Sequence, residues 1–234
     1  MGMMPGSRQA PDRSHQRART REAILNSAVG LLRQGRQPTV AEAAEAAGVH
    51  RATAYRYFPT PQSLLADAAL TAGDPDQDET YRDVPGDDPL ALMDAGVRTV
   101  SDYMFREEAL FRSIVQVTIE RWFAQQDSND PQQAPARETR RFKWIDRALE
   151  PLADKLAADS LLRLRHALAL VFGAEALIVT RDVSRLNPDQ ATEVMRWAAA
   201  TLIIGALTEA KAPLPSSALA NGLHLDRGSV QSDS

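Results

Sequence analysis

The side chains best suited to chemistry lie together in one short segment in the first quarter of the chain. This segment carries Arg51, Ala52, Thr53, Tyr55, Arg56 and Tyr57. An arginine can donate two hydrogen bonds to a guanine edge, threonine and alanine can contact a thymine methyl group, and tyrosine and arginine can bind phosphates. Ala54 and Phe58 are four residues apart, so they would share the buried face of a short helix at residues 50–58. The pattern indicates a helix whose other faces could contact DNA.

A second short helix is predicted directly before this segment. Thr39 and Glu42 have the spacing of a capping box, in which a helix start and its third residue satisfy each other's backbone N–H groups. The apolar residues that follow recur at helical spacing, at Val40, Ala43, Ala44 and Ala47. Gly48 would end this helix, because glycine readily adopts the positive φ of a helix C-terminus. Two such helices form a helix-turn-helix, whose second helix enters the major groove; an ordinary pair of surface helices is the alternative.

Two stretches resemble the DNA-binding region of the tetracycline-repressor (TetR) family. They are AEAAGVHRATAYRYFPTPQSLLADA and, for that family's first helix, RTREAILNSAVGLL at residues 19–32. The resemblance covers about residues 17–70 and implies groove and phosphate contacts by Arg51, Ala52, Thr53, Tyr55, Arg56 and Tyr57. Arg17, Arg19, Thr39 and Thr60 complete the set of expected DNA contacts. Pro61 stands where many members have a phosphate-binding lysine, so Thr60 and Pro61 are expected to cap and begin the next helix instead.

Charge is distributed unevenly along the chain. The net charge is −4, yet residues 1–65 hold nine arginines against four acidic residues, so the acidic excess lies in the remainder. A basic end on an acidic body is typical of a protein that presents one end to DNA, although a solvated charged surface is the alternative. Residues 1–16 are expected to be a disordered basic arm. This arm could lie along phosphates or in a minor groove, or it could act only as a solubilising tail.

Several functional classes receive no support from the composition. The 234 residues include no cysteine, which excludes disulfides and cysteine-ligated metals, and the four histidines are scattered. We find no Ser-His-Asp arrangement, glycine-rich phosphate loop or metal-ligand cluster, so we expect neither an enzyme nor a bound cofactor. There is no signal-peptide pattern, and the apolar runs are too short to span a bilayer. We therefore expect a soluble, cytoplasmic protein.

Helical periodicity continues through the chain and no stretch has a convincing strand pattern, so the expected fold class is all-α. Residues 17–65 would form a three-helix head, residues 66–210 a helical ligand-binding and dimerisation body, and residues 211–234 a disordered tail. Helices are expected at about 20–34, 61–70, 89–104, 109–126, 142–152 with a stop or kink at Glu150-Pro151, 160–182 and 188–210. Residues 72–89 are predicted to be a long mobile loop, and helix 109–126, apolar on most sides, to be central.

The resemblance also implies a dimer and a small-molecule effector. In that family the last two helices of each subunit form a four-helix dimer bundle, so we expect a homodimer through 160–182 and 188–210; packing within one subunit is the alternative. The candidate ligand-binding residues are Met93, Val97, Phe111, Trp122, Phe123, Trp144 and Phe172. Glu175 interrupts an apolar run. It could bind a cationic or hydroxylated ligand, but a place at the dimer interface beside an arginine, or on the solvent-facing flank, is favoured.

The function implied by the resemblance is that of a DNA-binding transcriptional regulator. The favoured interpretation is a dimeric repressor that binds a palindromic operator in double-stranded DNA and is released by a small molecule. An activator, or a regulator without a small-molecule effector, is the alternative. Two recognition helices of a dimer must lie about one DNA turn, ~34 Å, apart. An effector that favours another separation must weaken DNA binding by the same coupling free energy.

Overall fold

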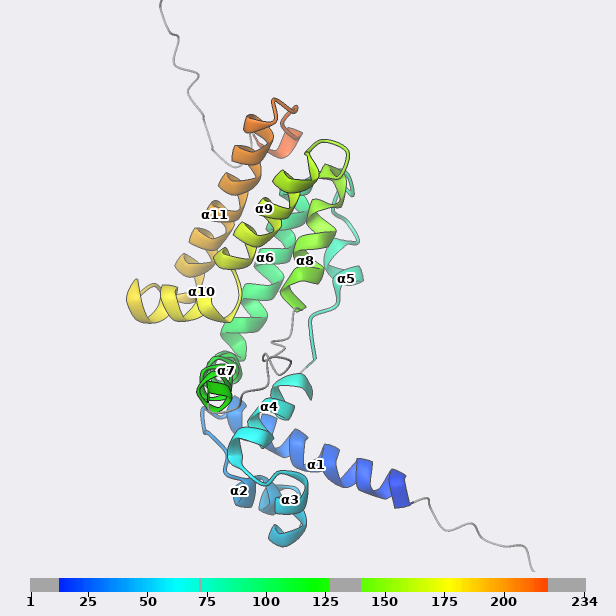
Figure 1. Cartoon of the computed structure of the whole chain (residues 1–234), viewed down its shortest axis with the longest axis vertical. Helices are drawn as coiled ribbons and strands as arrows, with labels where there is room; N and C mark the ends of the chain where they lie inside the picture. The colour runs from blue at the N-terminus through cyan, green and yellow to red at the C-terminus, as the bar shows by residue number, and fades with distance from the viewer. Residues whose placement is uncertain (1–12, 72, 127–139, 219–234) are drawn as a thin grey trace, which may run out of the picture. The chain divides into compact units, whose positions relative to one another are not determined.

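Helices make up all the regular structure in the described parts of the chain (Figure 1). The computed structural model describes residues 13–71, 73–126 and 140–218. Their contacts divide them into two units: unit 1 takes its residues from Met1–Gly73 and Glu107–Pro135, and unit 2 from Asp74–Arg106 and Ala136–Ser234. The all-α prediction is confirmed. Within these ranges no helix is both long and apolar enough to cross a membrane.

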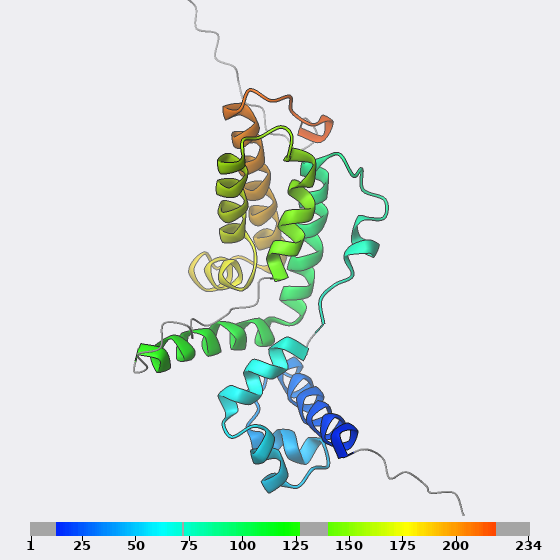
Figure 2. The same cartoon turned by 45° about the vertical axis from the view of Figure 1, so that its right-hand side comes forward.

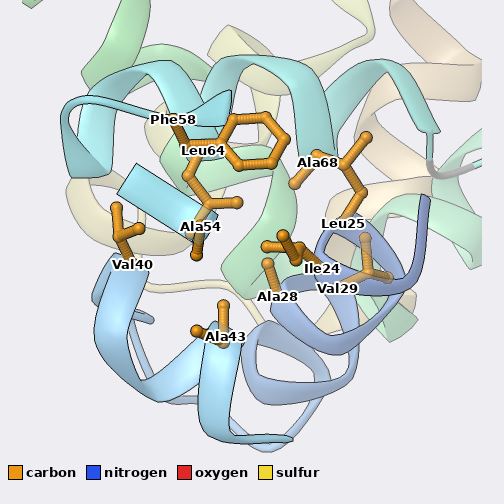
Figure 3. Close-up of a cluster of buried hydrophobic side chains, with 11 residues drawn as sticks. Ile24, Leu25, Ala28, Val29, Val40, Ala43, Ala54, Phe58, Leu64 and Ala68 are labelled. Atoms are coloured by element: carbon orange, nitrogen blue, oxygen red, sulfur yellow. The ribbon is translucent and has the colours of Figure 1, made fainter. Parts of the chain in front are cut away.

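Unit 1 holds the predicted helix-turn-helix. It consists of α1 (Arg13–Arg33), α2 (Val40–Ala46), α3 (Arg51–Tyr57), α4 (Pro61–Thr71) and α7 (Glu108–Gln126). Figure 3 shows side chains from the first four of these helices converging on one core. This core contains Ile24, Leu25, Ala28, Val29, Val40, Ala43, Ala44, Ala54, Phe58, Leu64 and Ala68. Phe58 and Leu64 are fully buried, and burying such a side chain stabilises a fold by about 1.5–3 kcal/mol.

Local signals set the helix ends of unit 1. The capping box of Thr39 and Glu42 is present at the start of α2. Gly48 has φ +64° after its end, and the Val49 N–H donates to the Ala44 carbonyl at 2.8 Å. Thr60 accepts a hydrogen bond from the Ser63 N–H at 3.1 Å, and Pro61 is the first residue of α4. The predicted starts of α2 and α4 and the glycine stop of α2 are therefore confirmed.

Unit 2 is a bundle built around α6 (Pro89–Arg106). Its other elements are α5 (Gln77–Tyr81), α8 (Arg140–Leu149), a 3-10 turn η1 (Glu150–Leu152), α9 (Ala158–Val171), α10 (Ala174–Ile178), a π-helical turn η2 (Val179–Val183), α11 (Pro188–Glu209) and a 3-10 turn η3 (Ser216–Ala218). Figure 2 shows α6, α8, α9 and α11 side by side. The predicted stop at Glu150-Pro151 is confirmed by the change from α8 to η1. The Asn187 capping box, with Pro188 in the first turn, begins α11 as predicted.

The segment predicted to be a long mobile loop contains a helix. Asp76 accepts hydrogen bonds from the N–H groups of Asp78 and Glu79, and α5 follows. Tyr81, the last residue of α5, is buried against α6. The loop prediction was wrong here because Tyr81, a single apolar anchor in an acidic stretch, gives no periodic pattern.

The helix predicted at 160–182 is broken. Phe172 is extended, Gly173 has φ +117°, and α10 starts immediately afterwards. The Arg141 guanidinium donates to the Ala169 carbonyl at 2.7 Å and so satisfies a carbonyl near the end of α9. The prediction of one continuous helix was wrong, because glycine and a partner from α8 allow the chain to turn.

Helix α7 does not have the central place predicted for it. Leu110 and Val117 pack with Leu32 and Leu65, which brings α7 into unit 1. Its later turns leave Ile119, Trp122 and Phe123 exposed. The contacts therefore divide the chain differently from the expected domains at 17–65 and 66–210, while the functional boundary at residue 65 stays a prediction.

Both predicted terminal segments are partly ordered. Helix α1 begins at Arg13, so the end of the expected 1–16 arm, and the predicted contacts Arg17 and Arg19, belong to a helix. Residues 1–12 lie outside the described residues. In the expected 211–234 tail, Ser217 donates a hydrogen bond to Asp88 at 2.8 Å and Ala218 is buried. Residues 219–234 also lie outside the described part of the chain.

Candidate nucleic-acid interface

The candidate interface is the outer surface of α3, which the core of unit 1 holds in place. Ala54 is fully buried against α1 and α2, and Phe58, directly after the helix, is equally buried (Figure 3). His50 caps α3, accepting a hydrogen bond from the Ala52 N–H through Nδ1 at 3.3 Å. The buried side chains and this cap thus fix the orientation of a helix that is too short to be stable alone.

The predicted contact residues lie largely on the faces of α3 that point away from the core, although Tyr57 is partly packed against it. Arg51, Ala52, Tyr55 and Arg56 are exposed, and Thr53 and Tyr57 are half-buried. Tyr55 keeps 46% of its surface exposed, which is high for an aromatic side chain. The arrangement places all six predicted residues on one short helix with polar groups available to a partner.

The two arginines of α3 keep their charges available. Arg51 approaches Glu45 only to 3.9 Å, and both side chains are largely exposed, so this ion pair contributes little. The guanidinium carbon of Arg56 lies 5.8 Å from the centre of the Tyr57 ring. Among the described residues Arg56 forms no ion pair. Three other arginines of the unit are paired within it: Arg21 with Asp67 at 2.6 Å, Arg33 with Glu107 and Arg36 with Glu42. Arg51 and Arg56 therefore leave positive charge on α3 that could meet a phosphate or a base.

The predicted contacts outside α3 have mixed surroundings. Arg17 and Arg19 are exposed on α1. The hydroxyls of Thr39 and Thr60 cap α2 and α4, so both already have partners within the protein. Hydrogen bonds from the backbone and the side chain of Thr39 lower the pKa of Glu42, with a contribution from Arg36.

One residue of this surface was missed by the sequence analysis. His50 is exposed at the N-terminal end of α3 and forms its cap. Its position directly before Arg51 was the available signal, because the N-terminal residues of a recognition helix lie nearest the bases. Serine, threonine, aspartate and asparagine are the usual caps, so a histidine was not recognised as one.

The predicted ligand-binding residues are divided between the two units. Met93, Val97, Trp144 and Phe172 are buried in unit 2. In unit 1, Phe111 is half-buried, and Trp122 and Phe123 lie on the surface with 52% and 62% of their areas exposed. Four of these residues therefore belong to the packing of unit 2 and three to unit 1, and ligand contact by any of them stays a prediction.

Glu175 lies on the flank of α10. Its carboxylate accepts a hydrogen bond from Arg141 of the same chain at 2.5 Å, and 46% of its side chain is exposed. This geometry fits the favoured flank interpretation rather than a buried ligand contact.

The described residues contain a small hollow in unit 2, and they contain no group of three or more potential metal ligands. The hollow is lined by Leu90, Met93, Asp94, Glu193, Arg196, Trp197 and Ala200 and has a volume of about 40 Å³. Ligand pockets commonly have volumes of about 300–1,000 Å³. In this conformation the hollow is too small for a drug-sized effector.

Comparison with known proteins supports the fold. No known family profile matches the chain, and no curated protein sequence matches it. The crystal structure of a TetR transcriptional regulator from Rhodococcus sp. RHA1 is similar, with a TM-score of 0.53 and 18% sequence identity. The similarity covers 80% of this chain and 97% of that chain. The chain therefore has the fold of this TetR transcriptional regulator.

Proposed function

We propose that the protein is a DNA-binding transcriptional regulator that reads double-stranded DNA with α3. One observation carries this proposal: α3 follows a capped α2 and a glycine turn, and it exposes Arg51, Tyr55 and Arg56 together. Arginines with no strong internal partner can form forked hydrogen bonds with guanine or bind phosphates. The fold shared with a TetR transcriptional regulator supports the same function.

The proposal includes a homodimer that binds a palindromic operator. Large apolar side chains are exposed on the last helices of unit 2, at Leu162, Leu170, Val179, Val183, Val194 and Trp197. Helices α9 and α11 lie side by side (Figures 1 and 2), and an ion pair between Arg163 and Glu209 joins them. Leu170 is 78% exposed and Trp197 58% exposed. Apolar surface of this kind marks an interaction site, and a second copy would cover the same helices by symmetry.

The regulator is further proposed to be a repressor that a small molecule releases. The resemblance of residues 17–70 to the TetR family supports this choice, and unit 2 supplies a buried core in which a ligand could bind. An effector would act by favouring a dimer whose recognition helices lie at the wrong separation for DNA. A DNA-binding activator without a small-molecule effector is the competing function, and compounds that release DNA would separate the two.

The test is selection of bound DNA from a random pool by the purified protein, followed by sequencing. We expect an enriched palindrome whose half-sites lie about one helical turn apart, ~10 bp. Enrichment of a single, non-repeated site would contradict the dimer and leave the DNA-binding function standing. Binding without any enrichment, lost steeply as salt is raised, would reduce the basic end to a nonspecific phosphate-binding surface.

A further inference from the structure

The hydroxyl of Tyr81 is buried in unit 2 without a partner. Tyr81 ends α5 and is 9% exposed, and its hydroxyl oxygen has no hydrogen-bond partner among the described residues. A buried polar group of this kind normally costs stability, so proteins rarely retain one. Burial raises the pKa of Tyr81 to about 12, and the positive charge of Arg147 acts in the opposite direction. For a phenolate at this oxygen, the cost of burial therefore outweighs the attraction of Arg147.

Gly96 of α6 lies next to the Tyr81 hydroxyl. A Cβ added to Gly96 would lie 2.7 Å from the Tyr81 hydroxyl oxygen and 3.5 Å from the Trp144 ring. Glycine inside a helix costs about 1 kcal/mol relative to alanine. The Tyr81 and Trp144 rings lie 5.7 Å apart in a tilted arrangement. The tyrosine ring thus occupies a space formed by α6 and α8.

The segment that carries Tyr81 is weakly anchored. Tyr81 is its single buried residue among positions 73–88, where acidic, proline and glycine residues are exposed or half-buried. Asp74 is paired with Arg140 at 3.0 Å before α5, and Asp88 caps α6 after it. Withdrawing the tyrosine would therefore break little packing beyond its own, as expected of a segment with low local stability.

We propose that Tyr81 is a removable plug in a binding site for a small neutral aromatic compound in the core of unit 2. The ligand takes the space of the phenol ring between Gly96 and Trp144, and α5 moves away when it binds. This proposal deepens the proposed function, on which its regulatory meaning rests, because it names the kind of effector and the segment that responds.

The shape and polarity of the space define the ligand. One tyrosine ring fills it, so a compound with a single aromatic ring fits, and the tilted Trp144 ring offers a favourable aromatic contact. A negatively charged group would be disfavoured at this depth, because the loss of hydration outweighs the attraction of Arg147. A ring without a hydroxyl also avoids the unpaired polar group that Tyr81 buries, so it can compete with the plug.

The test measures toluene binding by the full chain, in the absence of DNA, for the wild type and two variants. Tyr81→Ala removes the plug and is expected to bind toluene at least about tenfold more tightly than the wild type, because the binding-competent fraction rises. Tyr81→Phe keeps the plug and removes its unpaired hydroxyl. It is expected to bind about five- to a hundredfold more weakly, the range that corresponds to an unsatisfied buried group. Benzoate, which has the same ring with a charge, is expected not to bind.

Hydrogen exchange provides a second measurement that does not depend on how Tyr81→Ala folds. Toluene is expected to accelerate amide exchange at residues 76–82 in the wild type. Gly96→Ala should accelerate it without ligand, because the new methyl group collides with the Tyr81 hydroxyl. Gly30→Ala is the matched control, since a Cβ there meets no atom within 4 Å.

Equal toluene affinity in the three proteins, or tighter binding by Tyr81→Phe than by the wild type, would contradict the proposal that Tyr81 occupies the ligand site. Unchanged exchange at residues 76–82 with toluene and in Gly96→Ala would overturn it as well. These measurements use no DNA, so they separate this site from the proposed function. If the protein binds toluene as expected but selects no DNA sequence, the binding site would be supported and the proposed regulatory function would be contradicted.

Discussion

Thr39 and Glu42 hold the start of α2 through reciprocal hydrogen bonds. The Thr39 hydroxyl accepts from the Glu42 N–H at 3.1 Å, and the Glu42 carboxylate accepts from the Thr39 N–H at 2.9 Å. We predict that Thr39→Ala lowers the free energy of unfolding by about 1 kcal/mol, the usual loss for a removed cap. Chemical denaturation measures it, with Thr71→Ala at the exposed end of α4 as the control. A smaller loss for Thr39→Ala than for Thr71→Ala would contradict this role.

The same cap predicts a pH dependence at the residue scale. Because the folded-state pKa of Glu42 lies below its ordinary value of 4.5, its contribution is fully present above about pH 4.5. It is lost as the pH falls through the lower folded-state value. Wild type and Glu42→Gln should therefore differ in unfolding free energy at pH 7, and the difference should shrink on acidification. A difference that grows as the pH falls would show that the bonds favour the protonated carboxyl.

At the element scale, Gly173 and Arg141 allow the turn between α9 and α10. Gly173 has φ +117°, and an added Cβ would lie 2.8 Å from the central guanidinium carbon of Arg141. We predict that Gly173→Ala lowers the free energy of unfolding by about 2 kcal/mol or more, since the backbone strain alone is worth ~1–3 kcal/mol. Gly30→Ala, measured by the same denaturation, should be neutral or stabilising. Equal effects of the two substitutions would contradict the strained turn.

Helix starts could be predicted from the sequence more readily than a helix break or an isolated buried residue. The starts of α2, α4 and α11 were predictable because Thr39, Thr60 and Asn187 signal them within three residues. The break at Gly173 was not, because its partner Arg141 is distant in sequence and the surrounding residues have a continuous helical pattern. Tyr81 was missed for a related reason: its burial depends on Gly96 of another helix.

For the candidate interface, the residues of α3 could be predicted because Ala54 and Phe58 lie about one helical period apart and mark the buried face, which leaves the polar positions on the other faces. Their exposure is as expected, while DNA contact by any of them stays a prediction. Five of the seven apolar candidate ligand residues are aromatic. That property does not distinguish buried Trp144 from exposed Trp122, because burial depends on which helices pack together.

At the scale of the whole molecule, the exposed apolar side chains of α9 and α11 predict a dimer. Trp197→Glu should convert the dimer to a monomer, because it would place a charge in the centre of the buried contact. Sedimentation velocity at micromolar concentration would measure the change. Ile119→Glu on α7 is the control, since this residue is also exposed but lies in unit 1. A monomeric wild type, or a Trp197→Glu protein that stays dimeric, would contradict the interface.

The central claim is that the exposed face of α3 reads DNA sequence. The most direct measurement compares the affinity for the selected palindrome with that for a scrambled duplex, for the wild type and for Arg51→Ala/Tyr55→Ala/Arg56→Ala. Ala54 and Phe58 are untouched, so the variant should keep its fold, which circular dichroism would check. We predict that the affinity ratio falls by about a hundredfold or more, since each good base contact is worth ~1–3 kcal/mol. An unchanged ratio, with both duplexes bound more weakly, would show that another element reads the sequence.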